Sequence, residues 1–124
     1  MKDNRPVNLE ISTIKLPLAA ITSITHRISG IILFAGVAVL LWMLDKSLAS
    51  EAGFDALKND MSTPMVKLIV WIVVSALMYH LVAGIKHLLM DLGFGETKTG
   101  GPLGARIVLV VSLVLIVMAG VWIW

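Results

Sequence analysis

The hydrophobic pattern of the chain is dominated by three long apolar runs separated by polar segments. They cover residues 28–44, 68–85 and 107–124, and they contain 17, 18 and 18 residues without Asp, Glu, Lys or Arg. At a rise of about 1.5 Å per residue, each run spans roughly 26 Å as a helix, close to the ~30 Å hydrocarbon thickness of a bilayer. Because lipid offers no partner to backbone groups, helices are the expected form. The pattern predicts an all-α membrane protein with three transmembrane helices.

The polar segments between the runs give approximate helix boundaries. Thr63 followed by Pro64 indicates a helix start, because Thr caps helices and Pro is tolerated in the first turn. Gly101 and Pro102 repeat this pattern. We expect a single domain over residues 1–124, with helices at about 22–48, 64–91 and 103–124, a short outer-side segment at 50–61 suited to a surface helix, and a Gly-rich cytoplasmic loop at 93–104.

Composition agrees with a membrane location. Hydrophobic residues make up 58% of the 124 residues and charged residues 15%, which is more apolar side chain than a soluble core of this size can hide. The alternative for the first run is a signal peptide with small residues at Ser47 and Ala49, but a charged segment of 27 residues precedes that run. The N-terminus is neither Arg-rich nor free of acids, which disfavours a transit peptide and favours a bacterial inner membrane. The chain has no Cys, which excludes disulfides, iron–sulfur ligation and thiol catalysis.

Basic residues and tryptophans predict the same orientation in the membrane. Seven Lys and Arg residues lie before the first run or between the second and third, against three between the first and second. Basic residues favour the cytoplasmic side, so the N-terminus is expected inside and the C-terminus outside, with the helices running up, down and up. All four tryptophans fall at the predicted outer interface, where indole rings prefer to lie: Trp42, Trp71, Trp122 and Trp124.

The clearest candidate for chemistry is a histidine inside the second apolar run. His80 is followed at i+7 by His87 on the same helix face, and small residues lie near it at Ala76, Ala83 and Gly84. A protruding imidazole on a face with little side-chain bulk suits a haem, for which neutral imidazole is a common axial ligand. The alternative is that His80 bonds a neighbouring helix and that the small residues mark helix packing. If the haem is six-coordinate, its second ligand must come from another chain.

Two further groups of polar residues lie near the cytoplasmic ends of the predicted helices. His26, Arg27 and His87 form a set of cations suited to two haem propionate carboxylates. Ser23, Arg27 and Gly30 follow the spacing i, i+4, i+7, and a hydroxyl with a guanidinium can hydrogen-bond quinone carbonyls. The simpler interpretation is that Arg27 anchors the helix by snorkelling and that Ser23 starts it.

Asp91 lies four residues beyond His87. Its carboxylate is a candidate for orienting the His87 imidazole or for delivering protons to a nearby site. A solvated loop charge is the alternative.

These residues together resemble a known family, the cytochrome b556 subunits of bacterial succinate dehydrogenase, which are one of two membrane anchors in that complex. Order, spacing and hydropathy agree over essentially the whole chain. The segments that carry the resemblance are RPVNL at 5–9, SITHRISG at 23–30, Tyr79 with His80, GIKH at 84–87, and Asp91.

The resemblance implies that His80 is an axial ligand of a haem b, with the opposite histidine supplied by the second anchor subunit. It also implies that Ser23 and Arg27 line a ubiquinone site, and that His26, Arg27 and His87 lie near the haem propionates. The implied partners are a flavoprotein that oxidises succinate, an iron–sulfur protein, the second anchor and the lipid bilayer, with no nucleic acid. Succinate oxidation would then take place on another subunit.

Two alternatives remain open at this stage. The chain is also compatible with the anchor of a fumarate reductase, which runs the same chemistry in reverse. A cofactor-free structural or assembly protein is the alternative from a different class, with His80 satisfied by helix packing.

Overall fold

A computed structural model describes residues 7–124 of the chain. A short 3-10 helix, η1 (Ile11–Thr13), precedes four α-helices: α1 (Leu18–Ala49), α2 (Glu51–Asp60), α3 (Pro64–Asp91) and α4 (Gly100–Ile123). Three of them, α1, α3 and α4, are long and apolar enough to cross a membrane, which confirms the predicted all-α fold with three spans. Lys2, Arg5 and Pro6, which entered the charge count or the N-terminal motif, lie outside the described residues.

Two of the long helices begin earlier than the sequence pattern suggested. α1 starts at Leu18 instead of near residue 22, directly after Pro17, whose extended backbone (φ −65°, ψ 153°) precedes the first turn. α4 starts at Gly100 instead of near residue 103, and the hydroxyl of Thr97 accepts the backbone N–H of Gly100. In both cases the additional turn contains few charged residues, so it extends the helix without burying charge.

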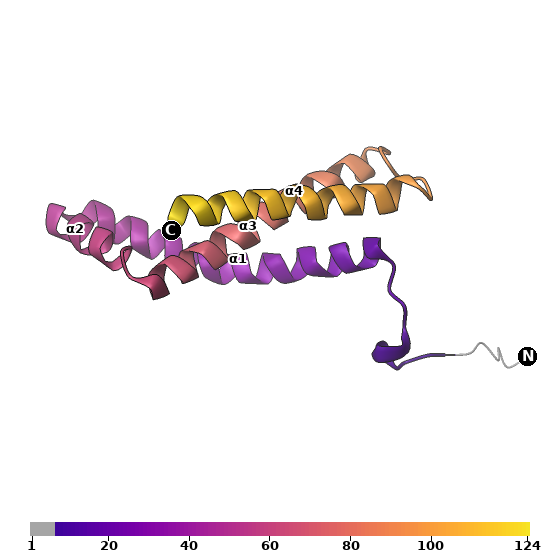
Figure 1. Ribbon diagram of the computed structural model, residues 1–124, viewed down its shortest axis with the longest axis horizontal. Helices are drawn as coiled ribbons and strands as arrows, with labels where there is room; N and C mark the ends of the chain where they lie inside the picture. The colour runs from indigo at the N-terminus through magenta and orange to yellow at the C-terminus, as the bar shows by residue number, and fades with distance from the viewer. Residues whose placement is uncertain (1–6) are drawn as a thin grey trace, which may run out of the picture.

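The three long helices lie side by side, and those that follow one another in the chain run in opposite directions (Figure 1). α3 contacts both α1 and α4, and α1 also contacts α4. The indole of Trp71, near the start of α3, reaches Ile116 near the end of α4, while Tyr79 and His80 reach the first turns of α1. The C-terminus therefore lies at the end occupied by α2, and the beginning of α1 lies at the opposite end with the α3–α4 connection.

Small residues allow these helices to approach one another closely. A Cβ placed on Gly36 of α1 would lie 2.7 Å from Cγ1 of Val73, and one placed on Gly120 of α4 would lie 3.1 Å from Nε1 of Trp71. A side chain at Gly36 would require α1 or Val73 to shift, and one at Gly120 would require the Trp71 indole to move by a few tenths of an ångström. Close approach through small residues is the usual way in which membrane helices gain packing energy, because burial of apolar surface adds little in lipid.

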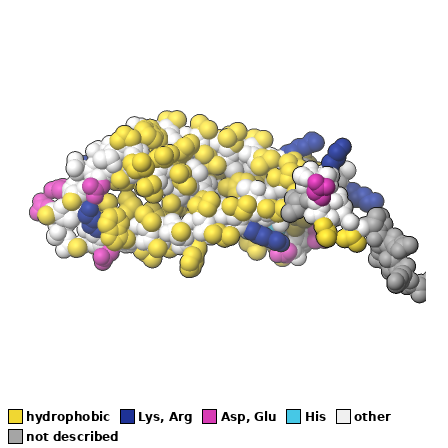
Figure 2. Space-filling view, turned by 90° about the horizontal axis from the view of Figure 1, so that it is seen from below, with side chains coloured by type: hydrophobic (Ala, Val, Ile, Leu, Met, Phe, Trp, Pro, Cys, Tyr) yellow, Lys and Arg dark blue, Asp and Glu magenta, His cyan; other side chains and the backbone are white. Residues whose placement is uncertain are grey.

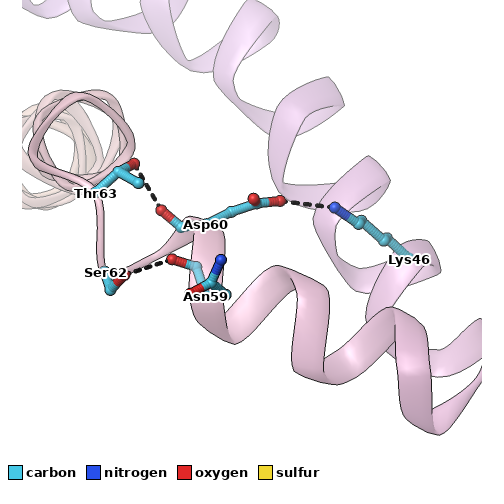
Figure 3. A network of polar contacts seen from close by, with 5 residues as sticks. All are labelled: Lys46, Asn59, Asp60, Ser62 and Thr63. Carbon is cyan, nitrogen blue, oxygen red and sulfur yellow. Dashed lines mark hydrogen bonds and ion pairs between the residues drawn. The ribbon is translucent and has the colours of Figure 1, made fainter.

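The corner between α2 and α3 is held by polar contacts that Figure 3 shows. The Lys46 ammonium bonds the Asp60 carboxylate at 2.7 Å and thereby connects the end of α1 to the end of α2. Pro64 occupies the first turn of α3 as predicted, and Thr63 is the cap residue by position. Its hydroxyl does not cap the helix, however, because it donates instead to the backbone carbonyl of Asp60.

The surface of the protein separates charge from hydrophobic area. Charged side chains gather towards the two ends of the bundle, and hydrophobic side chains cover the length between them (Figure 2). Apolar residues on the outer helix faces are largely exposed, as in Phe34 (87%) and Val110 (63%). In water this area would be highly unfavourable, whereas in a bilayer it faces lipid. The protein is therefore a multi-pass membrane protein.

Candidate functional site: a histidine cluster between α1 and α3

The three histidines of the chain meet at the end of the bundle where α1 begins. The ring centroids of His26 and His80 are 4.1 Å apart and those of His26 and His87 are 5.0 Å apart, each pair inclined by 18°. His80 and His87 are two turns apart on α3, and Gly84 lies between them. A Cβ on Gly84 would lie 3.5 Å from Nε2 of His26. This is an ordinary van der Waals distance, so the His26 ring packs against Gly84 and stacks on both of the other rings.

His80 is held through one ring nitrogen. Its Nδ1 lies 3.0 Å from the hydroxyl oxygen of Ser29 and 3.1 Å from the backbone carbonyl oxygen of His26. Its Nε2 has no hydrogen-bond partner within residues 7–124. This nitrogen is not fully buried, because it is absent from the buried polar atoms that have no partner. The ring is thus fixed on one side and accessible on the other, which is the arrangement that a metal-ligating histidine needs.

The other two imidazoles have different partners. Nδ1 of His87 lies 2.8 Å from the carbonyl oxygen of Ala83, one turn earlier on α3. Asp91, the last residue of α3, is exposed. Within the described chain, the contact with Ala83 orients the His87 ring. Nε2 of His26 is buried and has no partner among the described residues. A buried polar atom without a hydrogen bond lowers the stability of the fold, unless a ligand or a partner chain supplies the bond.

The small residues near His80 serve mainly to pack this chain's own helices. Ala76 and Ala83 are 8% and 1% exposed, and Ala83 forms a core cluster with Tyr79 and Val108. The open face that was expected around the imidazole is therefore absent at these two positions, because neighbouring helices already cover them. Tyr79 points elsewhere than His80, and its buried hydroxyl donates to the carbonyl oxygen of Thr22 at 3.0 Å.

The predicted quinone pair occupies the first turns of α1 beside this cluster. Ser23 is half-buried and Arg27 is exposed. Gly30, which the spacing grouped with them, lies instead against His80: a Cβ on Gly30 would be 3.1 Å from Cε1 of that ring. The structure thus places Gly30 at the histidine cluster.

The face of α1 that meets α3 carries its own polar residues, for which no role was predicted. Thr22 and Ser29 are 1% and 5% exposed, and together with His26 they follow the spacing i, i+4, i+7. Polar residues repeated at this spacing within an apolar helix indicate a face that contacts another helix. The sequence contains this spacing too, shifted by one residue from that of Ser23 and Arg27.

Two of the cavities in the described chain lie between the long helices. One of about 430 Å³ lies between α1 and α3 and is bordered by Thr25, Ser29, Ser75 and Tyr79 among apolar side chains. The other, about 530 Å³, lies between α3 and α4 with Lys86 as its one charged lining residue. Neither Ser23 nor Arg27 borders either cavity. In the described chain, the predicted quinone residues therefore lie outside both cavities, near the start of α1.

Three helices that are long and apolar enough to span a membrane, with a histidine cluster at one end of the bundle, define a multi-pass membrane protein with a polar site. The sequence profile of the family described as succinate dehydrogenase/fumarate reductase transmembrane subunit matches residues 1–119. The chain belongs to this family.

Individual relatives agree with this assignment. The chain is 46% identical over 125 aligned residues to the succinate dehydrogenase cytochrome b556 subunit of Coxiella burnetii, covering all of both chains. It is 37% identical over 94 residues to the subunit of the same name from Paracoccus denitrificans, covering 76% of this chain and 72% of that one. The succinate dehydrogenase cytochrome b560 subunit of Reclinomonas americana is 31% identical over 99 residues, covering 76% and 69%. These similarities identify a membrane-anchor subunit of succinate dehydrogenase.

Proposed function

We propose that this chain binds haem b together with a second anchor subunit and forms part of the ubiquinone-reducing site of succinate dehydrogenase. In this role it docks the iron–sulfur and flavoprotein subunits at the cytoplasmic face of a bacterial inner membrane. Succinate is oxidised on the flavoprotein, and the anchor provides the place where quinone takes up two electrons and two protons. The observation that carries the proposal is the His80 imidazole, which is fixed at Nδ1 and has no partner at Nε2 among residues 7–124.

The residues present fit a haem. The relatives are named as cytochromes b, and His80 offers an imidazole nitrogen of the kind that ligates haem iron. No group of three or more His, Asp or Glu side chains within residues 7–124 is placed to hold a metal ion. His80 would hold the iron from this chain, and the remaining ligands would come from a porphyrin and from a partner chain. When bound, the haem supplies a one-electron redox centre between helices.

The rest of the cluster suits the carboxylate edge of such a group. His26 presents a buried ring nitrogen that has no partner in the described chain, and His87 and Arg27 add basic groups at the same end. Charge-assisted hydrogen bonds to carboxylates are stronger than neutral ones, so these three residues are proposed to hold the propionates. Asp91, an exposed carboxylate four residues beyond His87, is proposed to deliver protons.

The proposed quinone contacts are the hydroxyl of Ser23 and the guanidinium of Arg27. A quinone partitions into lipid, and its carbonyl oxygens gain negative charge on reduction. Donors located at the first turns of α1, at the boundary between the apolar run and the polar end, are suited to stabilise that charge. The exposure of Arg27 leaves it free to face a cavity completed by partner subunits.

The orientation in the membrane follows from charge and tryptophan. Lys86, Lys98 and Arg106 lie at or near the end that carries the histidines, while the tryptophan-rich ends lie opposite. The positive-inside tendency then puts the histidine end in the cytoplasm, where the soluble subunits are proposed to dock.

The haem proposal is tested in the complete complex carrying His80→Ala. We expect the reduced-minus-oxidised spectrum to lose its b-type signal or to show altered ligation. The matched control is Leu81→Ala, which alters the adjacent, 52% exposed residue and is expected to keep the spectrum. An unchanged spectrum in the His80 variant would remove His80 as a ligand, and a wild-type complex without any haem signal would favour the cofactor-free alternative.

The quinone proposal is tested with Ser23→Ala and Arg27→Leu. We expect slower quinone reduction in both, with succinate oxidation by an artificial soluble acceptor largely retained. Thr25→Val is the control, because the Thr25 hydroxyl already bonds Ile21 of its own helix. Equal loss of both activities would indicate failed assembly and would contradict the site assignment. A preference of the purified complex for a lower-potential quinone would favour fumarate reduction.

A further inference from the structure

The segment from His26 to Gly30 contains two residues for which the proposed function has no use. Ser29 is 5% exposed inside an apolar helix, and its neighbour Gly30 lies against the His80 ring. Both residues therefore contact the imidazole from the opposite helix. A buried hydroxyl in a membrane span is expected to have a hydrogen-bonding purpose, since lipid cannot satisfy it.

The contacts around Ser29 allow one consistent assignment of protons. The His26 carbonyl oxygen can only accept, so its 3.1 Å contact with Nδ1 of His80 requires a proton on that nitrogen. The Ser29 oxygen, 3.0 Å from the same nitrogen, must then accept as well. Its own proton is directed to the His26 carbonyl oxygen, 2.7 Å away. In neutral His80, this network leaves the lone pair on Nε2.

We propose that Ser29 is a positioning residue for His80: it holds the imidazole in the tautomer whose Nε2 is free to ligate the haem iron. This inference rests on the proposed haem function and adds a specific residue to it. Gly30 completes the arrangement, because a side chain there would approach Cε1 of the ring to 3.1 Å and displace it. The motif at 26–30 thus fixes the angle and the protonation of a ligand that lies on a different helix.

The hydrogen bond also has an electronic consequence. A ligating histidine that donates its other N–H to an acceptor becomes a more basic ligand. A more basic ligand stabilises the higher oxidation state of iron and lowers the reduction potential. Removal of the Ser29 oxygen leaves only the His26 carbonyl as acceptor. The reduction potential of the bound haem should then rise.

The test uses the intact four-subunit complex with Ser29→Ala. We expect haem content to stay near one per complex, the midpoint potential of the haem to shift upward, and the electron paramagnetic resonance signal of the oxidised haem to change. Ser29→Thr keeps the hydroxyl, and position 29 borders a cavity of about 430 Å³. It should restore the potential and the resonance signal. Ser112→Ala is the matched control, because its hydroxyl is also buried but has no partner among the described residues.

The outcomes separate this inference from the function on which it rests. If Ser29→Ala retains haem with an unchanged potential and resonance signal, Ser29 is not a positioning residue. If Ser29→Ala fails to assemble, Ser29→Cys replaces the hydroxyl by a weaker hydrogen-bonding thiol of similar shape, and an unshifted potential in that variant overturns the inference. An unaltered haem in His80→Ala would instead overturn the haem proposal itself.

Discussion

Trp71 of α3 donates its indole N–H to the backbone carbonyl oxygen of Ile116 on α4, at 3.0 Å. Further along the same helix, the Tyr79 hydroxyl donates to the carbonyl of Thr22 on α1, also at 3.0 Å. α3 is therefore connected to both neighbours by side-chain donors that reach backbone acceptors. These bonds fix the axial position of α3 relative to α1 and α4. They thereby place His80 of α3 opposite Ser29 of α1.

The first prediction concerns the bond between Trp71 and Ile116. Trp71→Phe removes the donor and some packing volume, and we expect the unfolding free energy of the complex to fall by about 0.5–2 kcal/mol, as for hydrogen bonds between membrane helices. Trp42→Phe is the control, since Trp42 is 59% exposed. Thermal unfolding in one detergent would compare them, and equal stability of the two variants would contradict a structural role for the Trp71 bond.

A second prediction concerns the close approach of α1 and α3 at Gly36. Gly36→Ala places a methyl group 2.7 Å from Cγ1 of Val73, and we expect a loss of about 1–3 kcal/mol from overpacking. Val73→Ala in the same chain removes the clashing atom and should recover part of that loss. The measurement is a double-mutant cycle on thermal stability.

Gly101→Ala is the control for this cycle, because an added Cβ there meets nothing within 4 Å. It should leave stability unchanged or raise it slightly, as Ala favours helix over Gly. Strictly additive effects of Gly36→Ala and Val73→Ala would show that the two residues do not contact each other in the assembled complex.

A third prediction concerns the ion pair between Lys46 and Asp60. The two side chains are 29% and 47% exposed, so solvent screens the pair and its contribution is small. We expect Lys46→Met or Asp60→Asn to change stability by less than about 1 kcal/mol, with the difference shrinking at high salt. A loss that is large and independent of salt would indicate that the corner in Figure 3 is buried against a partner.

The fold could be predicted from the sequence because membrane helices leave a strong local signal. Apolar runs without charge locate α1, α3 and α4, and no long-range contact is needed to find them. The helix starts were less predictable, since Leu18 and Gly100 lie beyond the apolar runs. There, a preceding Pro17 and the Thr97 hydroxyl decide where the first turn forms.

The candidate site could be predicted only in part. His80 was conspicuous as an ionisable residue within an apolar run, and its proximity to His87 follows from helical spacing. The position of His26 between these two rings depends on how α1 and α3 pack, which one sequence does not specify. The role of Ser29 was missed for the same reason, because its partner lies 51 residues away in the chain.

The central claim is that this chain provides half of a shared haem site through His80. It is tested most directly by a high-resolution density map of the intact complex, in which the axial ligands of the haem iron are assigned. The account predicts continuous density between the iron and Nε2 of His80, with Nδ1 of the same ring bonded to Ser29 and the opposite ligand supplied by the second anchor. A haem iron ligated without His80, or a complex whose map and spectrum contain no haem, would contradict it.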